Sequence, residues 1–254
     1  MYPANSFAFR HVLDQVAVTK ANSIIEAGIG SGQAIPVWQS ANLEITGFDN
    51  NPERVTDSRA VMAHAGLDQA MVVCADAAIA ETLTAVPNNG TADILVGMGV
   101  LPHCPDLQGA VDNLTRMVRP GGWVFLELRN VLFSLFTFNR YTYDLFDQVM
   151  LEGVQPEVRA AGLDFIASRV LMDVPSNPAP LEQFHNPLTV ASELSDTALT
   201  NIRLLPFHYH AAPPAADVSP QRLDDASAVL ESRDDDWRGL LMCSAFLLAG
   251  QRRS

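Results

Sequence analysis

Three glycines at alternate positions follow an apolar run in the stretch IEAGIGSG, residues 25–32. Glycine is needed where a Cβ would collide with a neighbour or where φ must be positive. At the carboxyl end of a parallel strand, such a turn lets bare backbone approach a ligand, and this edge of an open α/β sheet binds nucleosides. Glu26 precedes the first glycine, and its carboxylate repels a phosphate but suits an ammonium or a sulfonium. We therefore expect a nucleoside that carries a positive charge.

A dinucleotide-binding loop is the main alternative for this stretch. That loop has the pattern G-x-G-x-x-G and places a pyrophosphate on the N-terminus of the next helix. Here the third glycine is Gly32, and position 33 is Gln33, so the spacing fails by one residue. Gln33 and Glu26 together oppose an NAD-type oxidoreductase.

Short apolar runs and longer amphipathic stretches alternate along the first half of the chain. The runs predict strands at Ser23–Ala27, Leu43–Phe48, Met71–Cys74, Ala92–Gly97 and Trp123–Leu128. The stretches predict helices at Ser6–Val18, Gln33–Ala41, Pro52–Ala65, Ala77–Ala85 and Asp106–Val118. Apolar strands separated by helical spacers indicate a parallel sheet with helices on both faces. Pro120, Gly121 and Gly122 are expected to end a helix and turn into the fifth strand.

The second half of the chain departs from this alternation. It predicts an aromatic, mostly helical segment, a proline-rich linker, helices at Glu157–Val170 and Leu188–Thr200, and strands at Ile202–His210 and Leu240–Ala249. We expect one domain, 1–254, with a Rossmann-like seven-stranded, mostly parallel sheet whose last pair of strands runs antiparallel to or reverses the parallel set. Its core would be 20–130 and 187–254, and a helical lid that binds the acceptor would occupy about 131–186.

A series of motifs resembles the class I S-adenosylmethionine-dependent methyltransferases. These are the glycine loop, GFDNNPERV, VVCADA, ADILVGMGVLPHCPD and VRPGGWVFLEL, and they cover residues 23–128. The resemblance implies S-adenosylmethionine as the cofactor, with Asp49 on the ribose and Asp76 on the adenine. Each aspartate has a plainer alternative as a helix cap. The full set of expected cofactor contacts is Glu26, Gly28, Ile29, Gly30, Gly32, Asp49, Asn50, Asp76, Ala77, Gly97 and Met98.

The methyl acceptor is expected at the carboxyl edge of the fourth and fifth strands. Methyltransferases of similar fold that act on nucleic-acid amino groups carry an Asn/Asp-Pro-Pro-aromatic tetrad there; GVLPHCPD instead resembles the small-molecule branch. His103 lies in this segment and is a candidate base for a hydroxyl acceptor, or an incidental loop histidine. At the end of the fifth strand, Arg129 and Asn130 are candidate substrate contacts. Arg129 can pair with an acidic substrate group, or with Glu127 or Asp144 as scaffold.

Aromatic residues recur through FSLFTFNRYTYDLF, residues 133–146. Such a stripe on a helix is typical of a core, but after the fifth strand it can also roof an acceptor cavity. Its polar members are further candidate substrate contacts: Asn139, Arg140 and Tyr141. His208 and His210 share one face of a late strand and are candidate bases. No cysteine or carboxylate stands at ligand spacing beside them, so no metal site is expected.

The net charge limits the kinds of partner that the protein can bind, and the cysteines indicate its compartment. The chain has 254 residues and a net charge of −13, which disfavours nucleic acid. Its three cysteines are far apart in sequence, which favours a reducing compartment. The first residues lack a signal-peptide pattern, and no apolar run is long enough for a membrane span. We expect a cytoplasmic protein with a small-molecule partner and neither nucleic acid nor membrane; a homodimer is one option for its assembly.

The sequence therefore predicts a methyltransferase that uses S-adenosylmethionine to methylate an oxygen or nitrogen of a small molecule, of a sugar-linked or natural-product type. The alternatives are a non-catalytic sensor or partner subunit that binds the cofactor, and an NAD-type oxidoreductase.

Overall fold

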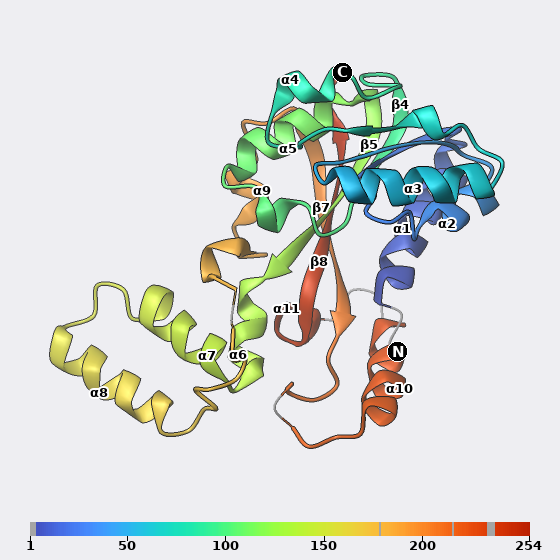
Figure 1. Ribbon diagram of the computed structural model, residues 1–254. Coiled ribbons are helices and arrows are strands. Elements are labelled where there is room, and N and C mark those ends of the chain that lie inside the picture. Colours follow the sequence, from blue (N-terminus) through green and yellow to red (C-terminus); the bar gives the residue numbers. More distant parts are fainter. Residues whose placement is uncertain (1–3, 178, 215, 233–236) are drawn as a thin grey trace. The chain divides into compact units, whose positions relative to one another are not determined.

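A computed structural model describes residues 4–177, 179–214, 216–232 and 237–254 (Figure 1). Its strands form one eight-stranded sheet in the order β3-β2-β1-β4-β5-β8-β7, with β6 beside β5. The strands are β1 Ser23–Ala27, β2 Glu44–Asp49, β3 Val72–Cys74, β4 Ala92–Gly97, β5 Val118–Asn130, β6 Phe184–His185, β7 Leu199–Tyr209 and β8 Cys243–Arg252. The predicted α/β fold with a mostly parallel sheet is confirmed. The additional strand is the two-residue β6, in the segment predicted as a linker.

Strand directions follow from the pairing. The pairs β1–β2, β1–β4, β2–β3, β4–β5 and β5–β6 are parallel. The amide of Arg253 donates to the carbonyl of Ala198, and the amide of His210 donates to that of Met242. The beginning of β7 therefore pairs with the end of β8, and its end with the beginning of β8, so these two strands are antiparallel; their arrows in Figure 1 point in opposite directions.

Burial explains why helices cover both faces of the sheet. In β1, the four residues from Ile24 to Ala27 are all buried, although alternate side chains of a strand point to opposite faces. The longer helices are α1 Ala4–Thr19, α3 Pro52–His64, α5 Leu107–Arg116, α8 Pro156–Ala167 and α10 Pro220–Glu231. The shorter ones are α2 Ile35–Ser40, α4 Ala80–Leu83, α6 Ser134–Thr137, α7 Arg140–Leu145, α9 Val190–Glu193 and α11 Gly239–Met242. No described helix has the length and apolar character that a membrane span requires.

Three local predictions were wrong. The helix expected at Leu188–Thr200 is only the four-residue α9, because residues 195–198 form a turn and Leu199 begins β7. The first three residues of the strand expected at Leu240–Ala249 belong to α11. Pro120 and the two glycines after it lie inside β5, where a register shift against β4 accommodates them.

The chain divides into two compact units. One contains residues 8–128, 189–205 and 247–254, and the other contains 1–7, 129–188 and 206–246. We call them the cofactor unit and the second unit, for reasons that the candidate site supplies. The predicted insertion, about 131–186, lies in the second unit, and its function as a lid stays a prediction.

Candidate active site

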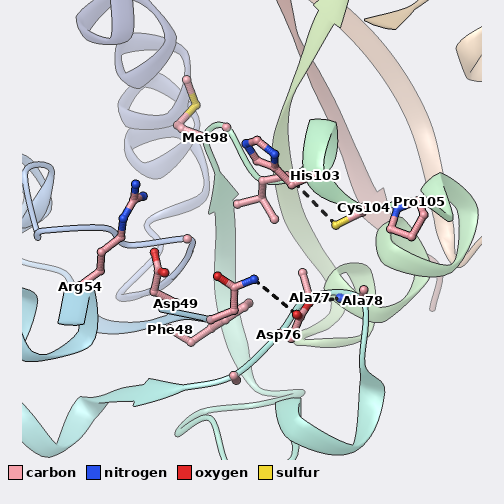
Figure 2. Close-up of a pocket in the computed structure, with 15 residues that line it drawn as sticks. Phe48, Asp49, Arg54, Asp76, Ala77, Ala78, Met98, His103, Cys104 and Pro105 are labelled. Carbon is pink, nitrogen blue, oxygen red and sulfur yellow. Dashed lines mark hydrogen bonds between the residues drawn. The ribbon is translucent and has the colours of Figure 1, made fainter. Parts of the chain in front are cut away.

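One cavity of about 270 Å³ lies within the cofactor unit, at the carboxyl ends of four parallel strands. Figure 2 shows Asp49 and Arg54 on one side of it and Cys104 and Pro105 on the other. The residues that line it are Gly28, Phe48, Asp49, Asn50, Arg54, Ala75, Asp76, Ala77, Ala78, Met98, Gly99, Val100, His103, Cys104 and Pro105. The loops after β1, β2, β3 and β4 thus each contribute to one hollow.

The glycine loop supplies close packing and positive backbone angles. Gly28 has φ +66°, and a Cβ on it would lie 2.5 Å from Cγ2 of Val100, across the cavity rim. Gly32 has φ +79°, and a Cβ there would lie 2.7 Å from Cδ1 of Ile35. Gly30 has φ +56° but open space around its missing Cβ. All three positions therefore favour glycine through a positive φ, and at Gly28 and Gly32 the lack of space for a Cβ adds to this. Of the three, only Gly28 lines the cavity.

Asp49 joins two loops through its carboxylate. It is 5% exposed; Oδ2 accepts the amide of Gly30 at 3.0 Å, and Oδ1 accepts the amide of Asn51 at 2.9 Å. The N-cap of α3 is Asn51, whose side chain accepts the amide of Glu53. The plainer interpretation of Asp49 as a helix cap is therefore wrong. Its carboxylate lies at the cavity wall beside the glycine loop.

Asp76 organises the next loop. Its Oδ1 accepts the amide of Ala78 at 2.9 Å, and the carboxamide of Asn50 donates to its Oδ2 at 3.4 Å. The N-cap of α4 is Ile79, so Asp76 closes a turn before the helix and does not cap it. The Asn50–Asp76 bond connects the loops after β2 and β3.

Glu26 is buried away from the cavity lining. It is 6% exposed, and Nε1 of Trp38 donates to its Oε2 at 2.9 Å. Burial raises the pKa of Glu26 to about 7, and the bond from Trp38 opposes this rise. The structure thus shows Glu26 anchoring α2, which carries Trp38. Four other expected contacts are also outside the lining residues: Ile29, Gly30, Gly32 and Gly97.

His103 is the one histidine among the residues that line the cavity. It ends the short helical turn Leu101–His103, which follows β4 and has Pro102 as its second residue. Next to it, the thiol of Cys104 donates to the carbonyl of Val100 at 3.6 Å. Burial and the charge of Asp76 raise the pKa of Cys104 to about 11, so this thiol is neutral and unreactive at pH 7.

Several lining residues were not predicted from the sequence. Most of them are neighbours of predicted residues, and one is not. Phe48, Ala75 and Ala78 flank the two aspartates that were predicted. Cys104 and Pro105 directly follow His103. Arg54 lies in the first turn of α3, five residues after Asp49, and nothing in the local pattern marks it as a cavity residue.

The other two candidate bases belong to the second unit. The hydroxyl of Ser244 lies 3.0 Å from Nδ1 of His208 and 3.2 Å from Nε2 of His210. Burial lowers the pKa of His208, and burial together with the charge of His208 lowers the pKa of His210 to about 4. The ring of Phe133 lies 4.6 Å from that of His210. Neither histidine lines the cavity.

The candidate substrate contacts of the second unit have partners inside it. The carboxamide of Asn130 donates to the carbonyls of Leu240 and Cys243, and that of Asn139 caps α7. The other two are Arg140, which pairs with Asp144, and Tyr141, whose hydroxyl accepts the amide of Ala179. Their substrate roles stay predictions. Among the described residues, no group of three or more His, Cys, Asp or Glu side chains is placed to hold a metal.

Comparison with known proteins identifies a methyltransferase domain in this chain. A family model described as a methyltransferase domain matches residues 25–126. The chain is 26% identical over 132 residues to a ubiquinone biosynthesis O-methyltransferase of Thiobacillus denitrificans, covering 51% of this chain and 53% of the relative. It is 23% identical over 212 residues to the protein of that name from Vibrio parahaemolyticus, covering 83% and 77%. The matched segment, residues 25–126, is therefore a methyltransferase domain of the class I, S-adenosylmethionine-dependent type.

Solved structures support the fold of this methyltransferase. The methyltransferase domain of the bacterial protein CtHen1-C has a TM-score of 0.54 and 11% identity, and the alignment covers 99% of this chain and all of that one. A methyltransferase from Thermotoga maritima has a TM-score of 0.50 and 10% identity, with 99% and 92% covered. The alignment to the Thiobacillus protein spans only about half of that relative.

S-adenosylmethionine fits the residues of the methyltransferase cavity. Two carboxylates, Asp49 and Asp76, can accept hydrogen bonds from ribose hydroxyls and an adenine amino group. The side chains of Phe48, Met98 and Val100 form an apolar part of the cavity wall. The described lining has a single guanidinium, that of Arg54, against these two carboxylates. A pyrophosphate would therefore meet repulsion in this cavity, which opposes a dinucleotide.

Proposed function

We propose that this methyltransferase transfers a methyl group from S-adenosylmethionine to an oxygen or nitrogen of a small molecule. The observation that carries the proposal is the cavity in which two acceptor carboxylates, a glycine turn and one imidazole meet. The names of the aligned relatives favour oxygen as the acceptor atom.

When bound, the cofactor supplies a methyl group already activated by a sulfonium. The protein then has to align the acceptor with this methyl carbon and exclude water. Asp49 and Asp76 would hold the nucleoside through its hydroxyl and amino groups. Gly28 lines the cavity without a side chain, so its backbone would lie close to the ligand.

A hydroxyl acceptor loses its proton as its oxygen attacks, so a base assists the transfer. His103 lines the cavity and is our candidate for this base. His210 is a weaker candidate, because its pKa of about 4 makes the ring a poor proton acceptor at pH 7. An amine acceptor that is already neutral needs no such base.

Calorimetry with S-adenosylhomocysteine tests the cofactor site. We expect binding of S-adenosylhomocysteine and none of NAD. Asp49→Ala removes a charged hydrogen-bond partner and should weaken the affinity about 10- to 100-fold. Asp68→Ala is the matched control, because Asp68 also accepts a backbone amide two residues ahead but lies outside the cavity lining. Binding of NAD with no binding of S-adenosylhomocysteine would refute the proposal.

Turnover tests the base. His103→Ala should lower kcat about 10²- to 10⁴-fold for a hydroxyl acceptor and leave the affinity for S-adenosylhomocysteine nearly unchanged. His64→Ala, an exposed histidine at the end of α3, should behave as wild type. A normal rate for His103→Ala would mean that His103 is not the base. Alignment of the acceptor with the methyl carbon would then account for catalysis. Cofactor binding without turnover on any acceptor would instead favour a sensor or partner subunit.

A further inference from the structure

Helix α8 of the second unit is packed on one side only. Arg159, Leu163 and Ile166 are half-buried and follow one another at intervals of four and three residues, so they share one face of the helix. α8 contacts α7 and the helical turn 146–150, and the guanidinium of Arg159 donates to the carbonyl of Asp147 in that turn at 2.9 Å. None of the twelve residues of α8 is buried. A helix of this length depends on packing for its stability in water.

A second face of α8 is apolar and exposed. Val158 and Phe165, two turns apart, are each 59% exposed. Between them lie Ala161, which is exposed, and Gly162, which is half-buried; both are small enough for another backbone to come close. Arg169 is exposed on the same side, since its guanidinium carbon lies 3.5 Å from the centre of the Phe165 ring. We call these five residues the α8 face.

The charge around the α8 face disfavours a lipid surface. Val149, Met150 and Leu171, close to α8 in the sequence, are each at least 50% exposed, so the apolar surface extends beyond the helix. Helices that lie on membranes carry basic residues on their polar face. Anionic lipids would repel the segment 138–174, and a protein partner suits it better. It has three arginines against six acids: Arg140, Arg159 and Arg169 against Asp144, Asp147, Glu152, Glu157, Asp164 and Asp173.

The order of residues along the α8 face makes it complementary to itself. A twofold axis between its two small residues would run two α8 helices antiparallel and place Val158 of one copy opposite Phe165 of the other. The same axis would bring Arg169 opposite position 154 of the second copy, about 4.5 Å along the helix from Glu157 of that copy. Glu157 is exposed, and this offset is within reach of an arginine side chain. Opposite charges therefore meet twice, once on each side of the axis.

We propose that the α8 face is a homodimer interface, in which two copies of this chain pack α8 against α8 in antiparallel orientation. The inference does not rest on the proposed function, because it uses neither the cavity nor turnover. One short helix from each copy should bury less than the total of about 1,600 Å² of a standard interface, so we expect a reversible dimer with a Kd of about 10–100 µM.

Sedimentation equilibrium tests the apolar part of the interface, over about 5–500 µM protein to bracket this Kd. Val158→Glu should raise the Kd at least about 30-fold, because the twofold axis places two unpaired carboxylates in the contact. Val229→Glu is the matched control. Val229 is 58% exposed on α10 of the same unit, so the variant adds the same charge at the same exposure but outside the α8 face. It should keep the wild-type Kd.

Exchanging two charges tests the antiparallel arrangement. Arg169→Glu should raise the Kd about 5- to 30-fold, because two acids then meet on each side of the axis. Glu157→Arg should do the same through two bases. The double variant should recover most of the affinity, whereas the two effects would add if these residues did not face each other. Both side chains are exposed, so the far-UV circular dichroism of all three variants should equal that of wild type.

Three results would overturn the inference: a wild type that is monomeric at every concentration, a Val158→Glu variant with the wild-type Kd, and a double variant weaker than either single one. A monomeric wild type that floats with phosphatidylcholine vesicles would assign the α8 face to lipid instead. Failure of the proposed function is observed separately, as absence of S-adenosylhomocysteine binding, since no sedimentation measurement includes the cofactor.

Discussion

The two units hold their buried polar groups in different ways. In the cofactor unit, both oxygens of Asp49 accept backbone amides, one of them only two residues away. In the second unit, His208 and His210 are held by the side chain of Ser244, more than thirty positions along the chain. A site built on backbone groups depends on strand ends and loop spacing. A site built on side-chain pairs depends on which strands become neighbours.

The largest expected effect comes from crowding the backbone of the cofactor unit. Gly28→Val places a side chain where a Cβ alone would lie 2.5 Å from Val100, at a backbone φ of +66°. We expect the affinity for S-adenosylhomocysteine to fall more than 100-fold, because the loop must move out of the cavity. Gly66→Val is the control: its φ is +74°, but nothing lies within 4 Å of the added Cβ. Gly66→Val should cost about 1–2 kcal/mol of stability and no affinity.

If Gly28→Val bound the cofactor normally, the backbone account of this cavity would be wrong.

A smaller effect, on the free energy of unfolding, tests the burial of Glu26 in the same unit. Folding raises the pKa of Glu26 from its ordinary 4.5 to about 7. Between these values the folded state keeps a proton that the unfolded chain has lost, so the free energy of unfolding falls as the pH rises through this window. The fall should be about 3 kcal/mol and should be absent in Glu26→Gln, in which the amide oxygen still accepts from Trp38. Urea unfolding at pH 5 and pH 8 measures it.

Glu44→Gln, at an exposed glutamate of β2, should retain the wild-type pH dependence. An identical dependence in Glu26→Gln and wild type would mean that Glu26 ionises normally in the folded protein.

The smallest effect tests the second unit. Ser244→Ala removes the hydroxyl that contacts both His208 and His210 and should lower the free energy of unfolding by about 1–3 kcal/mol. Ser232→Ala, which removes a bond to the backbone at the end of α10, should have almost no effect. The affinity of both variants for S-adenosylhomocysteine should equal that of wild type. A Ser244→Ala variant with normal stability would mean that this hydroxyl does not hold the imidazoles.

Sequence reasoning was most successful where one strand and its following loop suffice. β1 and β4 begin and end where the apolar runs predicted, because runs bounded by glycines and turn residues leave little freedom. Gly28, Asp49, Asn50, Asp76, Ala77, Met98 and His103, all predicted site residues, line the cavity. It was less successful after β5, where turns shortened the expected helix at 188–200 and α11 replaced the start of the last strand.

By itself, the sequence determined the α/β alternation and the strand ends that carry the cavity, since these follow from local spacing of apolar runs and glycines. The tertiary structure decided which polar groups face the ligand. It buried Glu26 against Trp38, brought Arg54 into the cavity lining and placed Arg129 over the ring of Phe184. These outcomes depend on contacts between residues far apart in the chain, and no local pattern encodes such contacts.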